Sequence, residues 1–243
     1  MIRVRLFSLV CLMLLWLQCC TSFVNAQVEA PAAETLLRRM TDAYASTKSY
    51  SDNGVVFHFH KSKRDPDSTP FSIVFLRPDH LRFEMTNGVG SPYLPQTRSV
   101  LWSDGNSAQT WDESSQEVRT SRDAVRQISC FTGISSRSVH NVSSLLQKNF
   151  GWQEYLYQIS SPRVVGEELF GGTNCYRIEG RGRAMRQFEI WIGKTDYLIR
   201  KIRTTHPDWQ DEEIHENIVI NQQISTTVFT FTPPGSREGR AKR

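Results

Sequence analysis

The feature that most constrains the fold is a series of short segments in which apolar residues recur at every second position. In Val55–His60, for example, Val55, Phe57 and Phe59 alternate with their neighbours, and a period of two places such residues on one face of a β-strand. Similar segments follow after polar or Pro- and Gly-containing turns: Phe71–Arg77, His80–Met85, Ser99–Gly105 and Ala108–Glu113. Short strands in succession with brief turns predict an antiparallel meander.

Helical spacing replaces this pattern in two places. Ala32–Tyr50, before the first strand, carries apolar residues three and four positions apart, as on one face of an amphipathic helix. In the middle of the chain, Ser121–Cys130 and Ser138–Phe150 are both compatible with helices. Strand-like segments then return: Arg163–Leu169, Thr173–Arg181, Arg186–Gly193, Tyr197–His206, Glu212–Gln223 and Ser225–Pro234. Without an internal repeat or a composition boundary, this order predicts one domain.

The stretch Phe188–Ile202 (FEIWIGKTDYLIRKI) predicts a hairpin that is apolar on both faces. Phe188 and Ile190 share one face of the first strand, whereas Trp191 lies on the other. Many aromatic residues fall in predicted strands, and the simple interpretation is that they fill a core. However, one long sheet has two faces, and one or two helices cover only one of them. If the sheet curls, its concave side forms an apolar cleft of the kind that binds small molecules or lipids.

Residues 1–26 have the composition of a secretory signal peptide. Arg3 and Arg5 precede the apolar core Leu6–Leu17, and Val24-Asn25-Ala26 offers a cleavage site before Gln27. Cys19 and Cys20 leave open the alternative of a lipid anchor, although the residues before them suit that processing poorly. We expect an exported protein with a cleaved signal peptide, and the lipid anchor is the minority alternative; a periplasmic destination is what the family resemblance described below implies.

The net charge of +4 comes from the two ends of the chain. Two arginines belong to the signal peptide, and the tail Ser236–Arg243 holds four basic residues and one acid. The body between them is close to neutral, so the composition does not favour nucleic-acid binding. We therefore expect a folded domain over residues 27–235 and a basic disordered tail over residues 236–243.

Two cysteines remain after cleavage, Cys130 and Cys175. In an oxidising compartment a disulfide between them is the natural pairing. Two buried thiols that never meet are the alternative.

Motifs for catalysis are missing from the sequence. It contains no Gly-x-Ser-x-Gly elbow, no Gly-rich phosphate loop and no His-Glu-x-x-His segment. His58 and His60 share a strand face, but two histidines leave a metal short of ligands, so a solvent-facing strand is the better interpretation. Acidic runs such as Asp211–Glu213 have the character of solvated turns. We expect no enzyme, no metal and no cofactor.

Several phrases of the chain, taken in order, resemble the LolA-like family of periplasmic lipoprotein carriers and lipoprotein-sorting proteins. They are a Pro before a Leu-Arg-Phe strand, an Asp-Gly hairpin before an aromatic strand, a Trp-bearing hairpin and a closing Phe-x-Phe-x-x-Pro. In this sequence these are Arg77–Met85, Ser103–Val118, Phe188–Ile202 and Val228–Pro234. The resemblance implies an α+β, mostly antiparallel β fold, an incomplete, half-open barrel of about eleven strands with helices covering the concave face.

The resemblance also implies a function. A LolA-like protein would bind an apolar ligand, a lipid or lipoprotein acyl chain, as a non-catalytic carrier and a monomer, with membrane-bound donor and acceptor proteins as possible partners. The alternative is a regulatory module that senses lipid or lipoprotein in envelope stress signalling. The long insert that contains Cys130 departs from the carriers, and the role of Arg82 is open.

From the strand alternation we predict that the apolar cavity is lined by residues among Phe57, Phe59, Phe75, Phe83, Trp102 and Trp191. The alternation does not decide which face of the sheet is concave. It does predict that Phe188 and Trp191 occupy different environments.

Overall fold

The computed structural model describes residues 31–90, 95–122, 131, 138–147, 159–182 and 186–235. The predicted signal peptide, the predicted basic tail and Cys130 lie outside these residues, so those assignments and the disulfide stay predictions. No helix in the described ranges is long and apolar enough to cross a membrane.

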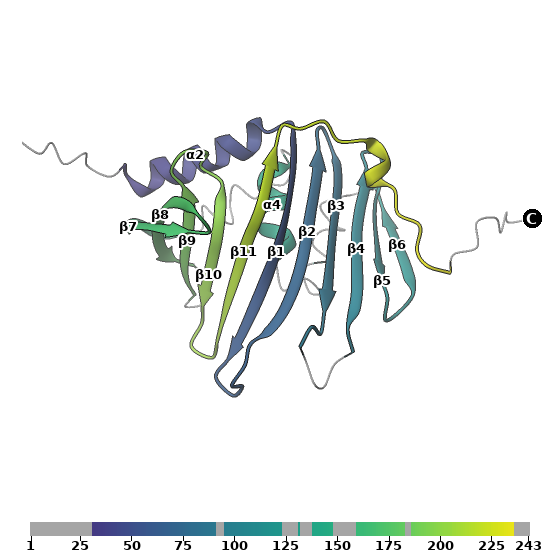
Figure 1. The fold of residues 1–243 in the computed structure, drawn as a ribbon, viewed down its shortest axis with the longest axis horizontal. Helices are drawn as coiled ribbons and strands as arrows, with labels where there is room; N and C mark the ends of the chain where they lie inside the picture. The colour runs from purple at the N-terminus through teal and green to yellow at the C-terminus, as the bar shows by residue number, and fades with distance from the viewer. Residues whose placement is uncertain are drawn as a thin grey trace, which may run out of the picture. The chain divides into compact units, whose positions relative to one another are not determined.

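The described chain is dominated by one antiparallel sheet of eleven strands (Figure 1). The strands are β1 (Ser49–His60), β2 (Asp67–Leu76), β3 (His80–Asn87), β4 (Thr97–Asp104), β5 (Ala108–Asp112), β6 (Glu117–Ser121), β7 (Ser160–Phe170), β8 (Thr173–Arg181), β9 (Gln187–Gly193), β10 (Ile199–Thr205) and β11 (Trp209–Ile220). The spatial order is β6-β5-β4-β3-β2-β1-β11-β10-β9-β8-β7. Among the described residues the sheet therefore ends at β6 and β7 and does not close. This is the half-open barrel that the resemblance implied.

Two meanders form the sheet, and they meet where β1 pairs with β11. Gly54 lies opposite His215 in this seam, and Val56 lies opposite Glu213. A Cβ on Gly54 would fall 2.5 Å from the carbonyl oxygen of Ile214 and 2.1 Å from the Phe71 ring. Gly54 is therefore needed because β11 and the Phe71 side chain approach the backbone of β1 too closely for a side chain.

Helix α2 (Ala33–Ser46) and helix α4 (Ser138–Leu146) pack against the same face of the sheet. Leu36, Met40 and Tyr44 of α2 are fully buried, at the spacing of one helix face. The guanidinium of Arg77 donates to the carbonyl oxygens of Thr47 and Tyr44, at 2.7 and 2.9 Å, and so satisfies the end of α2. We call the helix-covered side of the sheet the inner face and the opposite side the outer face.

The main core lies between the inner face and the two helices. It takes every second residue of the strands, as the alternation predicted, together with Phe131 and the apolar residues of α4. From the strands it includes Tyr50, Val56, Phe71, Ile73, Phe75, Leu81, Phe83, Met85, Leu101, Ile178, Phe188, Ile190, Ile192, Ile199 and Ile202.

Three differences from the predicted elements have physical causes. The first helix ends at Ser46 because β1 begins at Ser49, six residues before the predicted strand. Strand β6 was not predicted, since four of its five residues are exposed and it has no apolar alternation. Ser225–Pro234 was predicted as a strand and is a 3-10 helix, Thr226–Phe229, with irregular chain after it.

Candidate functional site

The inner face carries the main apolar core of the described residues. Phe83 is its centre on the β1–β6 side: its ring stacks on Phe71, with centroids 5.6 Å apart, and meets Phe131 edge-on at 5.8 Å. On the β7–β11 side, Ile190 and Ile192 are fully buried. The inner face beneath the two helices is therefore the candidate site for an apolar ligand.

The six predicted cavity residues lie on both faces of the sheet. Phe75 and Phe83 are fully buried on the inner face. Phe57 and Phe59 alternate with Val56, an inner-face residue, and therefore point outward; Phe59 is 36% exposed. Trp102 and Trp191 also lie on the outer face, outside the main core. The structure confirms that Phe188 and Trp191 occupy different environments, because Phe188 belongs to the inner core.

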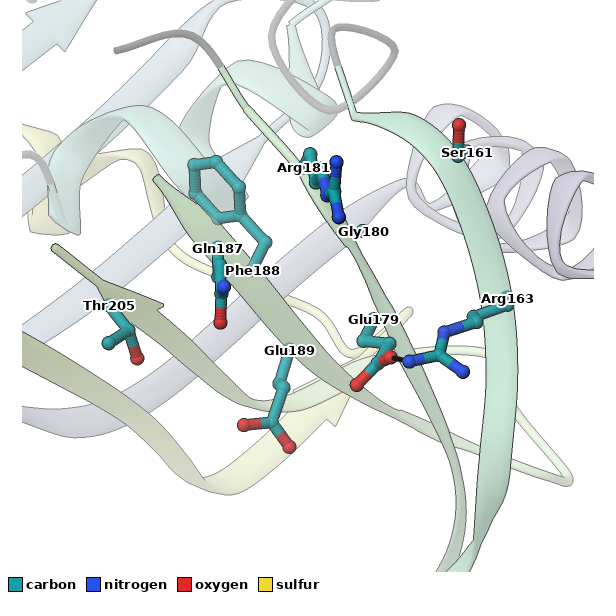
Figure 2. Close-up of a pocket in the computed structure, with 9 residues that line it drawn as sticks. All are labelled: Ser161, Arg163, Glu179, Gly180, Arg181, Gln187, Phe188, Glu189 and Thr205. Carbon is teal, nitrogen blue, oxygen red and sulfur yellow. Dashed lines mark ion pairs between the residues drawn. The ribbon is translucent and has the colours of Figure 1, made fainter. Parts of the chain in front are cut away.

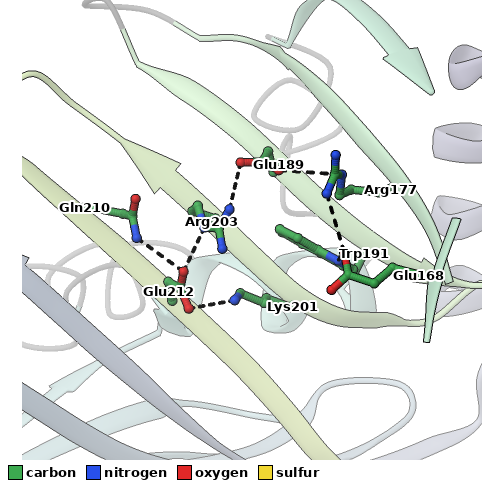
Figure 3. A network of polar contacts seen from close by, with 8 residues as sticks. All are labelled: Glu168, Arg177, Glu189, Trp191, Lys201, Arg203, Gln210 and Glu212. Carbon is green, nitrogen blue, oxygen red and sulfur yellow. Dashed lines mark hydrogen bonds and ion pairs between the residues drawn. The ribbon is translucent and has the colours of Figure 1, made fainter. Parts of the chain in front are cut away.

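On the outer face, Trp191 is held in a network of charged side chains (Figure 3). Its indole N–H donates to Glu168 at 3.0 Å, and the charged groups of Lys201 and Arg203 lie 5.1 and 5.2 Å from its ring centroid. Lys201 and Arg203 also both pair with Glu212. Burial alone would raise the pKa of Glu212, but these two cations outweigh it and lower the pKa. Trp191 is thus part of a structural network with satisfied partners.

In a second cluster on the outer face, Trp102 and Arg82 contact the C-terminal segment. Phe231, from the C-terminal segment, packs against Trp102 and Trp111 with centroids 5.0 and 5.5 Å away. Arg82 Nη1 donates to the carbonyl oxygens of Val228 and Thr230, at 2.8 and 3.2 Å. Arg82, whose role the sequence left open, therefore anchors the C-terminal segment to the outer face.

The inner face also contains buried polar side chains that the sequence analysis missed. We call Tyr50, Asp52, Glu213, His215 and Asn141 the acid–histidine cluster. Asp52 Oδ2 accepts from the Tyr50 hydroxyl at 2.7 Å and lies 2.6 Å from His215 Nδ1. His215 Nε2 lies 2.9 Å from Glu213 Oε1, and the Asn141 amide of α4 donates to Glu213 Oε2.

Burial and the contacts between its members together set the charges of this cluster. The side chains of Asp52 and His215 are 0% exposed, and that of Glu213 is 6% exposed. Burial alone would lower the pKa of His215, but its hydrogen bonds and ion pairs with Asp52 and Glu213 raise that pKa to about 9. Burial raises the pKa of Glu213. The expectation that Asp211–Glu213 is a solvated turn is therefore wrong for Glu213, which lies within β11.

A pocket of about 540 Å³ lies beside β7, β8 and β9 (Figure 2). Arg163 and Glu179 form an ion pair among its lining residues, and Phe188 is the one large apolar side chain drawn there. The lining residues are Ser161, Arg163, Glu179, Gly180, Arg181, Gln187, Phe188, Glu189 and Thr205. A lining of this polarity suits polar groups better than an acyl chain.

The remaining predicted residues have the following places. His58 Nδ1 lies 2.8 Å from Asp211 Oδ1, in a pair on β1 and β11. Within the described ranges no group of three or more His, Cys, Asp or Glu side chains is arranged to hold a metal ion. Cys175 is fully buried in β8, while Cys130 lies outside the described residues.

Comparison with known proteins gives a family and a fold. A family model described as "Predicted periplasmic protein (DUF2092)" matches residues 33–238. No curated protein sequence matches the chain.

Solved structures with the same architecture share little sequence with it. LprF from Mycobacterium bovis is 12% identical, with a TM-score of 0.50 over 80% of this chain and 95% of that chain. An uncharacterised conserved protein from Thermus thermophilus is 10% identical, with a TM-score of 0.51 over 84% of this chain and 95% of that chain. LolA superfamily protein NE2245 from Nitrosomonas europaea is 8% identical, with a TM-score of 0.37 over 83% of this chain and 99% of that chain. The expected fold, a half-open antiparallel sheet, is confirmed, and LprF and the Thermus thermophilus protein share it.

Proposed function

The chain belongs to the DUF2092 family of predicted periplasmic proteins, and we propose that it binds an apolar ligand, a lipid or the acyl chains of a lipoprotein, without catalysing a reaction. The protein is periplasmic and has a LolA-like fold. In this proposal residues 27–235 form the binding domain, which follows a cleaved signal peptide, residues 1–26.

The observation that carries the proposal is the apolar inner face beneath α2 and α4. Helix α2 has 14 residues and α4 has nine, which correspond to about 21 and 14 Å of helix. Eleven strands at about 4.8 Å spacing extend over about 50 Å. The two described helices thus lie against the apolar residues of a wider sheet, and in this proposal a shift of these helices admits the acyl chain.

An acyl chain needs a binding protein because its exposure to water is unfavourable. An acyl chain in water costs about 0.8 kcal/mol for each exposed CH₂ group. A protein that takes lipid or lipoprotein across an aqueous compartment must therefore offer an apolar interior, and donor and acceptor proteins in the two membranes would be its partners.

The two faces of the sheet make the ligand contacts testable. Phe75 and Phe83 are the predicted ligand residues that lie on the inner face. Ligand contacts at Phe57, Phe59, Trp102 or Trp191 would require a ligand on the outer face, where Trp102 and Trp191 already contact other side chains.

The test begins with protein purified from periplasm and analysed by native mass spectrometry. We expect co-purifying lipid, and binding of a fluorescent fatty acid by the delipidated protein. Phe83→Asp should abolish this binding, because a carboxylate would lie in the apolar interior, whereas Phe57→Asp on the outer face should retain it.

Both variants need a folding control by circular dichroism. Protein that carries no lipid and binds no fluorescent fatty acid would contradict the proposal. Loss of binding in Phe57→Asp alone, with both variants folded, would move the site to the outer face.

A further inference from the structure

The acid–histidine cluster is unusual because it places two carboxyl groups and an imidazole inside the main core. Asp52 belongs to β1, Glu213 and His215 to β11, and Asn141 to α4. The cluster therefore lies where the β1–β11 seam meets the covering helix. Buried carboxyl groups are costly unless a positive charge and hydrogen bonds compensate for them.

One acceptor of the cluster, Asp52 Oδ1, lacks a hydrogen-bond donor within the described ranges. Both ring nitrogens of His215 bond to carboxylate oxygens, so the imidazole donates from both and carries a positive charge. The cluster therefore holds two carboxyl groups around one imidazolium. Asp52 Oδ2 accepts two hydrogen bonds, whereas Asp52 Oδ1 is buried and has no partner among the described residues.

Among the described residues, the side chains around the cluster give Asp52 Oδ1 no hydrogen bond. Phe71 of β2 meets the His215 ring edge-on, with centroids 5.4 Å apart. The hydroxyl of Tyr44 on α2 is engaged by the backbone N–H of Ile199. Ser143 of α4 is 0% exposed, and its hydroxyl also has no partner among the described residues.

We infer that the acid–histidine cluster is the head-group subsite of the proposed apolar site and takes a protonated amine at the end of an alkyl chain. This inference rests on the proposed function and names the ligand class that the inner face prefers. An ammonium group brings one positive charge and three donors, which complement the two carboxyl groups and the unpartnered oxygen of Asp52. A carboxylate head group would instead bring a third acidic group and no donor for that oxygen.

The pKa of His215 agrees with this assignment. Burial alone would lower this pKa, but Asp52 and Glu213 raise it to about 9. The cluster therefore stabilises a positive charge within the core.

The test compares three ligands that share a dodecyl chain: dodecylamine, dodecanol and dodecanoate. Each displaces phenylnaphthylamine, a neutral apolar fluorescent probe, from delipidated full-length protein at neutral pH. We expect dodecylamine to bind about tenfold more tightly than dodecanoate, the effect of one charge-assisted hydrogen bond, with dodecanol between them. If the natural protein binds dodecanoate as tightly as dodecylamine, or more tightly, the inference is overturned.

Two matched variants locate the preference. Asp52→Asn keeps the shape of the side chain but removes its charge, and it should abolish the preference for the amine while the neutral probe still binds. Asp211→Asn makes the same change in the histidine pair outside the cluster, Asp211 with His58, and should preserve the preference. An amine preference that survives Asp52→Asn overturns the inference.

The outcomes also separate this inference from the proposed function. If the probe and all three dodecyl compounds bind with similar affinity, the apolar site exists and the head-group subsite fails. If neither the probe nor any dodecyl compound binds, both fail together.

Discussion

At the scale of single residues, His215 connects protonation with stability. Its pKa in the folded protein is about 9, against an ordinary value of 6.5, because Asp52 and Glu213 hold the imidazolium. A group whose folded pKa is raised stabilises the protein fully below its unfolded pKa and loses this contribution as pH rises through the folded value.

We therefore predict that the melting temperature falls as pH rises from about 6.5 towards and through 9. Replacing His215 with Gln should cost about 3–5 kcal/mol, because it leaves two carboxyl groups buried without their cation, and should flatten the pH dependence in this range. Thermal denaturation across a pH series measures both effects.

The matched control is His206→Gln, at the turn between β10 and β11, where His206 is only partly buried. It should leave the melting curves close to those of the natural protein. A melting temperature that stays constant through pH 9 in the natural protein would contradict this account of His215.

At the scale of elements, the C-terminal segment is the clearest surprise. Ser225–Pro234 alternates Phe229 and Phe231 with threonines, which is a strand pattern, yet it pairs with no strand in the described sheet. Its aromatic side chains contact rings on the outer face instead: Phe229 packs against His80, and Phe231 packs against Trp102 and Trp111. Its alternation therefore reflects side-chain docking, which sequence periodicity does not distinguish from sheet pairing.

We predict that Phe231→Ala loosens this segment. The change removes aromatic contacts with Trp102 and Trp111 and the nearby guanidinium groups of Arg82 and Arg98, at a cost of about 1–3 kcal/mol. Tryptophan fluorescence should shift to longer wavelength as Trp102 and Trp111 become hydrated, and limited proteolysis should cleave the segment sooner.

Val118→Ala is the control, because Val118 is 46% exposed on the edge strand β6, and it should alter neither fluorescence nor proteolysis. Unchanged tryptophan emission in Phe231→Ala would mean that the segment is held by the Arg82 hydrogen bonds alone.

The sequence predicted most elements because their alternation reflects burial on one face. Strand β8 (Thr173–Arg181) has the predicted bounds, and Ile178 in it points to the core. It did not predict β6, which buries nothing. The acid–histidine cluster was also beyond prediction, because Asp52 and His215 are 163 positions apart and only the register of β1 on β11 brings them together. The sequence also does not show which face of the sheet the helices cover, and the six predicted cavity residues therefore divide between the two faces.

At the scale of the whole molecule, the sheet order predicts a gradient of stability. Strands β1 and β11 have neighbours on both sides and contribute buried residues to the core, whereas β6 and β7 are the sheet edges and are largely exposed. Hydrogen exchange should therefore be slowest in β1 and β11 and fastest in β6 and β7.

Peptide-resolved hydrogen exchange by mass spectrometry measures this gradient directly. Edge strands that exchange as slowly as the seam would show that another chain or segment covers them. Added apolar ligand should slow exchange in α4 and in the inner-face strands if the proposed site is correct.

The β1–β11 seam also has a consequence for how the protein is made. A chain that emerges N-terminus first completes β1 early, but the partner on its far side, β11, is the last strand to emerge. Until then, β1 is an open edge through which the unfinished protein can pair with other chains. The nascent protein is therefore prone to aggregate in the interval between the synthesis of β1 and that of β11. A chaperone that protects the β1 edge during this interval would improve the yield of folded protein.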